Sequence, residues 1–176
     1  MMVGGNLMRL FFWSIVGGLV GTGLMDIVGI FATEKLKIRW GGWGGNAALG
    51  RWALGIFDGH FVHKNIIESS PVKNEVLVGG VFHYFTGGSL ALTYPLFYLA
   101  FNVPMQGNHL ISSLLWGLST VLFPWFILFP GFGWGFFGAR APSNVRSLIS
   151  PMVEHLLYGL GLGIVLNIAS ELIAFG

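Results

Sequence analysis

Charged residues are distributed along this chain so that four long stretches contain almost none of them. The stretches cover about residues 10–32, 76–101, 110–129 and 147–174. A membrane-spanning helix needs about 20 consecutive, mostly apolar residues, because the hydrocarbon core of a bilayer is about 30 Å thick. We therefore predict an all-α, polytopic membrane protein in which four transmembrane helices form a compact bundle and residues 1–176 form a single integral membrane domain.

The overall composition excludes several classes of protein. Of the 176 residues, 54% are hydrophobic and 9% are charged, whereas a soluble domain has roughly 25% charged residues. A water-soluble fold is therefore excluded, and a formal charge of +2 without a cluster of Lys and Arg argues against a nucleic-acid partner. Without cysteine the chain has no disulfide or thiolate nucleophile, so a metal ion would need His, Asp or Glu ligands.

The loops between the stretches differ in charge, which predicts an orientation. The loop between the first two stretches holds Lys35, Lys37, Arg39, Arg51, Lys64 and Lys73, and the loop between the last two holds Arg140 and Arg146. Loops rich in Lys and Arg stay in the cytoplasm, so we expect both termini on the opposite side. Within the first loop, Ala47–Phe57 is expected to form a short interfacial helix capped by Asn46.

Three of the four stretches contain ionisable residues at a similar depth. Asp26, His83 and His155 each lie eight or nine residues from a charged residue at the cytoplasmic end of their stretch. Each therefore lies on the order of 10–14 Å inside the membrane boundary, and Glu154 adjoins His155. Charged groups in a bilayer are costly unless they are paired or hydrated, so we predict one intramembrane polar cluster of these four residues.

Pro151 leaves the depth of two of these residues open. If the last helix begins at Pro151, Glu154 is an acid of the first turn that interacts favourably with the helix dipole, and His155 lies near the headgroups. The cluster then reduces to Asp26 and His83, which join two helices and have no other role.

A glycine follows each intramembrane histidine one turn later on the same helix face. Gly87 follows His83, and Gly159 and then Gly163 follow His155. Such glycines leave a groove beside each imidazole, where the two histidines could bind the iron of haem b, or a divalent metal ion together with the carboxylates. Close packing of helices through small residues is the simpler explanation of the same glycines.

The loops contain further candidate site residues. Arg51, Arg140 and Arg146 are expected to contact anionic lipid headgroups or an anionic ligand at the cytoplasmic face. His60 and His63 are weak candidates for metal ligands, because they would share a face if their segment were helical. The sequence has no phosphate-binding loop, nucleophile elbow or zincin motif, so it indicates no catalytic residue.

Several short motifs occur in a specific order and spacing from Asp26 to Gly159. They are Met25-Asp26, Gly50-Arg51-Trp52, Gly59-His60 with His63, His83-Tyr84 with Gly87, Pro124 with Pro130-Gly131-Phe132-Gly133, Ala139-Arg140-Ala141-Pro142, and Arg146 with His155 and Gly159. In these motifs the chain resembles a bacterial family catalogued as domain of unknown function 2938. The resemblance implies a protein of the bacterial inner membrane, and with the loop charges it implies periplasmic termini. It brings no established activity.

Three functions from different classes are compatible with these patterns. The first is binding or permeation of a proton, a metal ion or a small polar solute at the intramembrane cluster. Such a protein is expected to act as a homo-oligomer or with a membrane-complex partner, because four helices enclose little volume. The second is a membrane redox protein that binds haem b or a metal, and the third is a structural or accessory subunit among membrane lipids. We favour the first, with the third close behind it, and expect proton or solute coupling to titrate with the histidines near pH 6.5.

Overall fold

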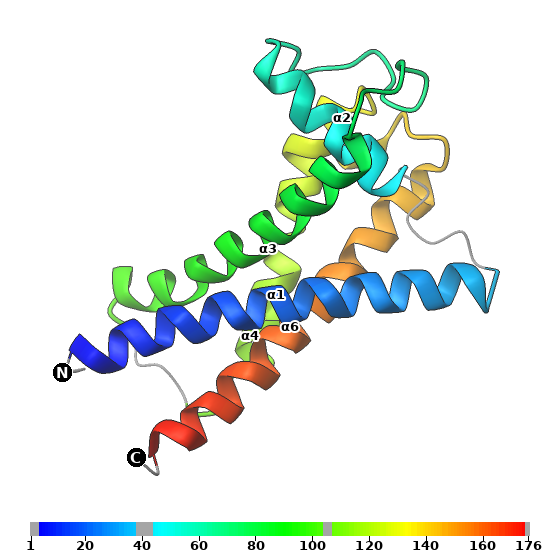
Figure 1. Ribbon diagram of the computed structural model, residues 1–176. Helices are drawn as coiled ribbons and strands as arrows, with labels where there is room; N and C mark the ends of the chain where they lie inside the picture. Colours follow the sequence, from blue (N-terminus) through cyan, green and yellow to red (C-terminus); the bar gives the residue numbers. More distant parts are fainter. Residues whose placement is uncertain (1–3, 38–43, 104–106, 175–176) are drawn as a thin grey trace. The chain divides into compact units, whose positions relative to one another are not determined.

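The computed structural model describes residues 4–37, 44–103 and 107–174, and every regular element in these ranges is helical (Figure 1). The elements are α1 (Gly4–Glu34), α2 (Gly45–Phe57), α3 (Glu75–Ala100), α4 (Leu110–Ser119), a π-helical turn (Pro124–Leu128), α5 (Phe129–Gly131), a 3-10 turn (Phe136–Gly138) and α6 (Asn144–Ala174). The predicted all-α class is confirmed. Arg39, one of the loop cations, lies outside the described residues.

Four helical segments are long and apolar enough to cross a membrane, as predicted. They are Leu7–Glu34, Glu75–Ala100, Leu110–Gly131 and Asn144–Glu171. Large apolar side chains on these segments are exposed, with 66% of Ile27, 69% of Leu77 and 74% of Ile111 accessible. Water would not stabilise so much exposed apolar surface, so these faces suit contact with lipid.

The third spanning segment, predicted for residues 110–129 and found at Leu110–Gly131, changes its helix type within its length. α4 ends at Ser119, and a π-helical turn follows at Pro124–Leu128. Proline has no amide hydrogen, so Pro124 cannot donate to the carbonyl group one turn before it. The backbone then continues with a longer hydrogen bond from the N–H of Phe129 to the carbonyl oxygen of Pro124, which is the π-helical pattern.

The chain divides into two compact units, each built from segments that are far apart in the sequence. The first unit comprises Met1–Ile27, Thr86–Thr120 and His155–Gly176, and the second comprises Val28–Phe85 and Val121–Glu154. Three helices, α1, α3 and α6, therefore contribute one part to each unit.

Glycines allow close backbone contact between the helices of the first unit. A Cβ atom at Gly21 of α1 would overlap the carbonyl oxygen of Tyr158 on α6, and a Cβ at Gly18 would press on the backbone of Gly87 on α3. Only a residue without a side chain permits such an approach. The buried apolar side chains around these contacts are Met25, Ala91, Tyr94, Tyr158, Leu162 and Leu166.

In the second unit, α2 packs against the beginning of α3. A Cβ at Gly50 would overlap the carbonyl oxygen of Glu75, and one at Gly79 would overlap that of Asn46. The side chains buried around this contact come from α2, the following loop and the region of α5, which explains why short elements hold together here. They are Ala48, Leu49, Trp52, Ile66, Leu128, Phe129, Phe132 and Trp134.

α2 ends at Phe57 as predicted but begins two residues before the predicted Ala47. Its N-cap is Gly44 and not Asn46, which lies inside the helix. Gly44 has a φ angle of +85°, a left-handed conformation that glycine adopts at little steric cost. The start of this helix therefore depends on backbone freedom and not on a side-chain cap.

Candidate functional site

The four residues of the predicted intramembrane cluster lie on three membrane-spanning helices. Asp26 lies on α1, His83 on α3, and Glu154 and His155 on α6, and all four side chains are partly buried. Asp26 and His155 belong to the first unit, whereas His83 and Glu154 belong to the second. Each of the four has an interaction within the protein. Their function as one cluster stays a prediction.

The structure decides where the last helix begins. α6 starts at Asn144 and contains Pro151 in its interior. Glu154 therefore lies three turns into the helix, roughly 15 Å along its axis, and is not an acid of the first turn. The alternative with a helix that begins at Pro151 is wrong, because residues 144–150 already have helical backbone.

His155 is oriented by the C-terminal end of α4 in the first unit. Its Nδ1 lies 2.7 Å from Oγ1 of Thr120, and the same hydroxyl donates to the carbonyl oxygen of Gly117 at 2.6 Å. A hydroxyl group has a single hydrogen, so with that hydrogen on Gly117 the imidazole donates from Nδ1 to Thr120, and in the other tautomer of the ring Nδ1 is the acceptor.

The glycines near the two intramembrane histidines serve helix packing. A Cβ at Gly87 would overlap Oγ1 of Thr22, and a Cβ at Gly159 would overlap the carbonyl oxygen of Ser113. Neighbouring helices thus occupy the space that a haem groove would need, and the simpler explanation by close packing is confirmed. Among the described residues, no group of three or more His, Cys, Asp or Glu side chains is placed to hold a metal ion.

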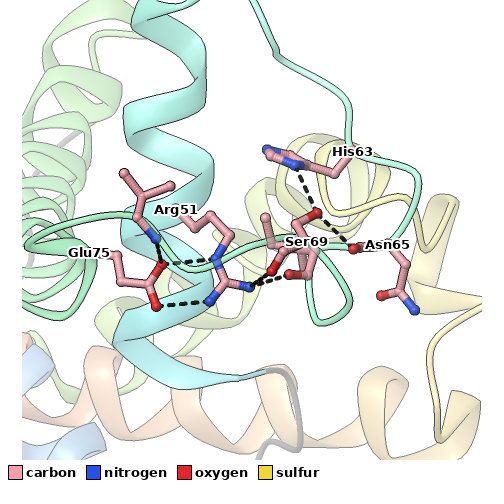
Figure 2. Close-up of polar contacts among 7 residues, drawn as sticks. Arg51, His63, Asn65, Ser69 and Glu75 are labelled. Atoms are coloured by element: carbon pink, nitrogen blue, oxygen red, sulfur yellow. Dashed lines mark hydrogen bonds and ion pairs between the residues drawn. The ribbon is translucent and has the colours of Figure 1, made fainter.

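Arg51 anchors the second unit internally (Figure 2). Its guanidinium group donates to both carboxylate oxygens of Glu75, from Nε at 2.9 Å and from Nη2 at 2.8 Å. Nη1 donates to the carbonyl oxygens of Ile66 at 2.6 Å and Ser69 at 2.9 Å. Four of the five N–H donors are therefore used inside the protein, and the side chain is 10% exposed. This differs from the expected contact with lipid or an anionic ligand.

Three of the other predicted loop residues are exposed. Arg140 and Arg146 have exposed side chains, and so does His60. His60 and His63 do not share a helix face, because residues 60–74 form turns and irregular backbone. Lipid contact by the two arginines and metal binding by the two histidines stay predictions.

His63 lies beside the Arg51 anchor in a partly buried position. Its Nδ1 lies 3.4 Å from Oγ of Ser69, whose hydroxyl donates to the carbonyl oxygen of Asn65 at 2.9 Å (Figure 2). Its Nε2 is buried without a hydrogen-bond partner among the described residues. Burial lowers the pKa of His63, and the positive charges of His60 and Arg51 lower it further because they repel an imidazolium ion.

A buried polar group in the first unit was missed by the sequence analysis. His109, the N-cap residue of α4, is 5% exposed, and its Nδ1 lies 3.0 Å from Oη of Tyr94. Oη of Tyr94 lies 2.7 Å from Oγ of Ser112. The backbone N–H of His109 donates to Oδ1 of Asn167 at 2.7 Å. The sequence contains one signal for this group, namely the polar pair Asn108-His109 directly before an apolar stretch. The partners Tyr94 and Asn167 lie on other helices, so the sequence does not show that they contact His109.

Removing one partner of the Arg51–Glu75 ion pair should destabilise the protein more than removing both. Arg51→Met leaves a buried carboxylate without its counter-ion and should cost about 3–5 kcal/mol, whereas Arg51→Met combined with Glu75→Met should recover part of this loss. Thermal unfolding of the purified protein in detergent measures the difference, with the exposed Lys73→Met as the control. A double variant less stable than Arg51→Met alone would contradict this prediction.

His63 should make the protein less stable on acidification. Its pKa is lowered in the folded state, so the unfolded chain binds a proton more readily. The contribution of the neutral His63 to the free energy of unfolding is therefore fully present above a pH of about 6.5. It is lost as the pH falls from there towards the pKa of His63 in the folded state. His63→Gln should reduce this loss in melting temperatures measured between about pH 7.5 and 5.5. The exposed Lys35→Gln, whose charge does not act on His63, serves as the control, and equal pH dependence in both variants would refute the prediction.

Comparison with known proteins identifies one family. Its model, described as "Protein of unknown function (DUF2938)", matches residues 15–169. No curated protein and no solved structure gives a significant match to the chain. The matched region contains the four predicted intramembrane residues, the Arg51 anchor and His109, together with most of each membrane-spanning segment. Because the match covers most of the sequence, this chain belongs to the DUF2938 family.

Proposed function

We propose that this protein binds a proton or a small polar solute among its membrane-spanning helices and allows it to cross the membrane, with His155 as the group that takes up and releases the proton. The observation that carries the proposal is the hydrogen bond between Nδ1 of His155 and Thr120, whose own hydrogen is donated to Gly117. This contact orients an imidazole, a group that takes up and releases a proton reversibly, inside a membrane-spanning segment.

Two physical arguments support a functional reading of this residue. A polar ionisable side chain within a bilayer is costly, so it is usually retained for a role in binding or transport. Imidazole is also the side chain whose ordinary pKa is closest to neutral pH, which suits reversible proton uptake. Asp26, in the same unit, is the second ionisable candidate. His83 and Glu154 lie in the other unit.

We also propose that the protein resides in the inner membrane of a bacterium with its two basic loops in the cytoplasm. The described cations Lys35, Lys37, Lys64, Lys73, Arg140 and Arg146 have exposed side chains that such loops can present to anionic headgroups. An alkaline phosphatase fused after residue 176 is active only outside the cytoplasm, so it should be active in cells. Activity of the enzyme fused after residue 64 instead would reverse the assignment.

Proton passage should depend on His155 in a reconstituted system. Purified protein in liposomes that contain a pH-sensitive dye should dissipate an imposed pH gradient faster than empty liposomes do. His155→Gln keeps a polar side chain but removes the titratable group, and it should slow the flux at least about tenfold, as expected for loss of an acid–base group. His60→Gln removes an exposed loop imidazole and should leave the flux unchanged.

The same experiment separates transport from a structural role. Flux no faster than in empty liposomes, together with a lower melting temperature for His155→Gln, would refute proton passage and favour a structural subunit.

A further inference from the structure

His109, Tyr94 and Ser112 form a short chain of hydrogen bonds in the first unit. Nδ1 of His109 lies 3.0 Å from Oη of Tyr94, which lies 2.7 Å from Oγ of Ser112. Oγ of Ser112 lies 3.2 Å from the carbonyl oxygen of His109, so the chain returns to the residue where it began. These three residues come from α3 and the beginning of α4, and all their contacts lie within one unit.

Counting hydrogens shows that this chain can run in two directions. In the first arrangement, Ser112 donates to Tyr94, and Tyr94 donates to Nδ1 of His109, so the ring hydrogen is on Nε2. In the second, Nδ1 donates to Tyr94, Tyr94 donates to Ser112, and Ser112 donates to the carbonyl oxygen of His109. Both arrangements give every hydroxyl hydrogen an acceptor at the observed distances.

The surroundings keep this chain in place and the imidazole neutral. Tyr94 is 1% exposed and His109 is 5% exposed. The backbone N–H of His109 is bonded to Asn167 of α6, which fixes the residue independently of its ring. Burial lowers the pKa of His109, so the neutral ring with its two tautomers is the form present at neutral pH.

We propose that His109, Tyr94 and Ser112 are a proton relay, in which one proton enters at Nε2 of His109 and another leaves from Oγ of Ser112. Starting from the second arrangement, Nε2 binds the incoming proton and Nδ1 passes its hydrogen to Oη of Tyr94. Tyr94 then passes its own hydrogen to Oγ of Ser112, and the hydrogen of Ser112 leaves to a water molecule. The product is the first arrangement, so protons and charge balance.

This relay differs from the site at His155. At His155 one hydroxyl lies between the ring and a carbonyl oxygen, whereas at His109 two hydroxyls lie in series between them. Thr120 follows His109 by eleven residues, roughly 16 Å along α4, so the two sites are separate. The inference rests on the proposed function insofar as it gives the relay a task, namely to exchange protons at the opposite end of α4.

Nuclear magnetic resonance of the full chain tests the relay. The protein, with ¹⁵N-labelled histidine, is placed in lipid nanodiscs, and the ring nitrogens of His109 are assigned by their loss in His109→Gln. The wild-type ring should show both neutral tautomers, either as two sets of signals or as averaged shifts. Ser112→Ala removes one of the two acceptors near the Tyr94 hydroxyl. The hydroxyl should then always donate to Nδ1 of His109, so that only the tautomer with its hydrogen on Nε2 is observed.

A matched serine provides the control. Ser119 lies on the same helix, is exposed, and donates to the carbonyl oxygen of Trp116 at 2.6 Å. Ser119→Ala should therefore keep the wild-type ring signals. If Ser112→Ala does not fold, Tyr94→Phe replaces it, and the tautomer ratio should change because Nδ1 loses its partner. A single tautomer in the wild type, unchanged in the folded variant, overturns the relay.

The test is independent of transport. If the wild-type protein shows no proton flux in liposomes, the proposed function fails, but the two ring tautomers still decide whether the relay exists. If the wild type does conduct protons, Ser112→Ala should slow the flux and Ser119→Ala should not. Flux that is equal in these two variants would overturn the role of the relay in proton passage.

Discussion

The structure depends first on the requirement that backbone polar groups in a bilayer find hydrogen bonds within the protein. Long helices satisfy it for α1, α3 and α6, and the third spanning segment satisfies it with a π-helical turn where Pro124 lacks an amide hydrogen. Two side-chain hydroxyls of the first unit bond to carbonyl oxygens of their own helices or helix ends. Thr22 donates to the carbonyl oxygen of Gly18, and Thr120 donates to that of Gly117.

The second unit depends in addition on Arg51. One guanidinium group joins α2, the loop after it and the first residue of α3, because it binds the carboxylate of Glu75 and two loop carbonyl oxygens. Burying such a pair costs desolvation energy that good geometry must offset. Here the bidentate pairing supplies that geometry, and the carboxylate also accepts the backbone N–H of Val72 at 2.7 Å. Arg51, which counted as a loop cation in the sequence, is thus paired with Glu75 inside the protein.

Two histidines of the first unit show how one hydrogen can change the behaviour of a site. Both use Nδ1 to contact a hydroxyl, Thr120 for His155 and Tyr94 for His109. Among the described residues, the hydroxyl of Thr120 has only a carbonyl oxygen, that of Gly117, as its other partner. The hydroxyl of Tyr94 has a second hydroxyl beside it, that of Ser112, and so its direction can reverse. The chain of two hydroxyls at His109 therefore suits proton exchange.

The sequence by itself determined the all-α class, the four spanning segments and the family, because each depends on composition and spacing along the chain. It also predicted which helices contain Asp26, His83 and His155. Only the tertiary structure decided that Arg51 is an internal anchor and that His109 is buried against Tyr94. The partners of these residues are 24 and 15 positions away in the sequence. Contacts of this kind follow from how helices pack, and no periodic pattern within a single helix encodes them.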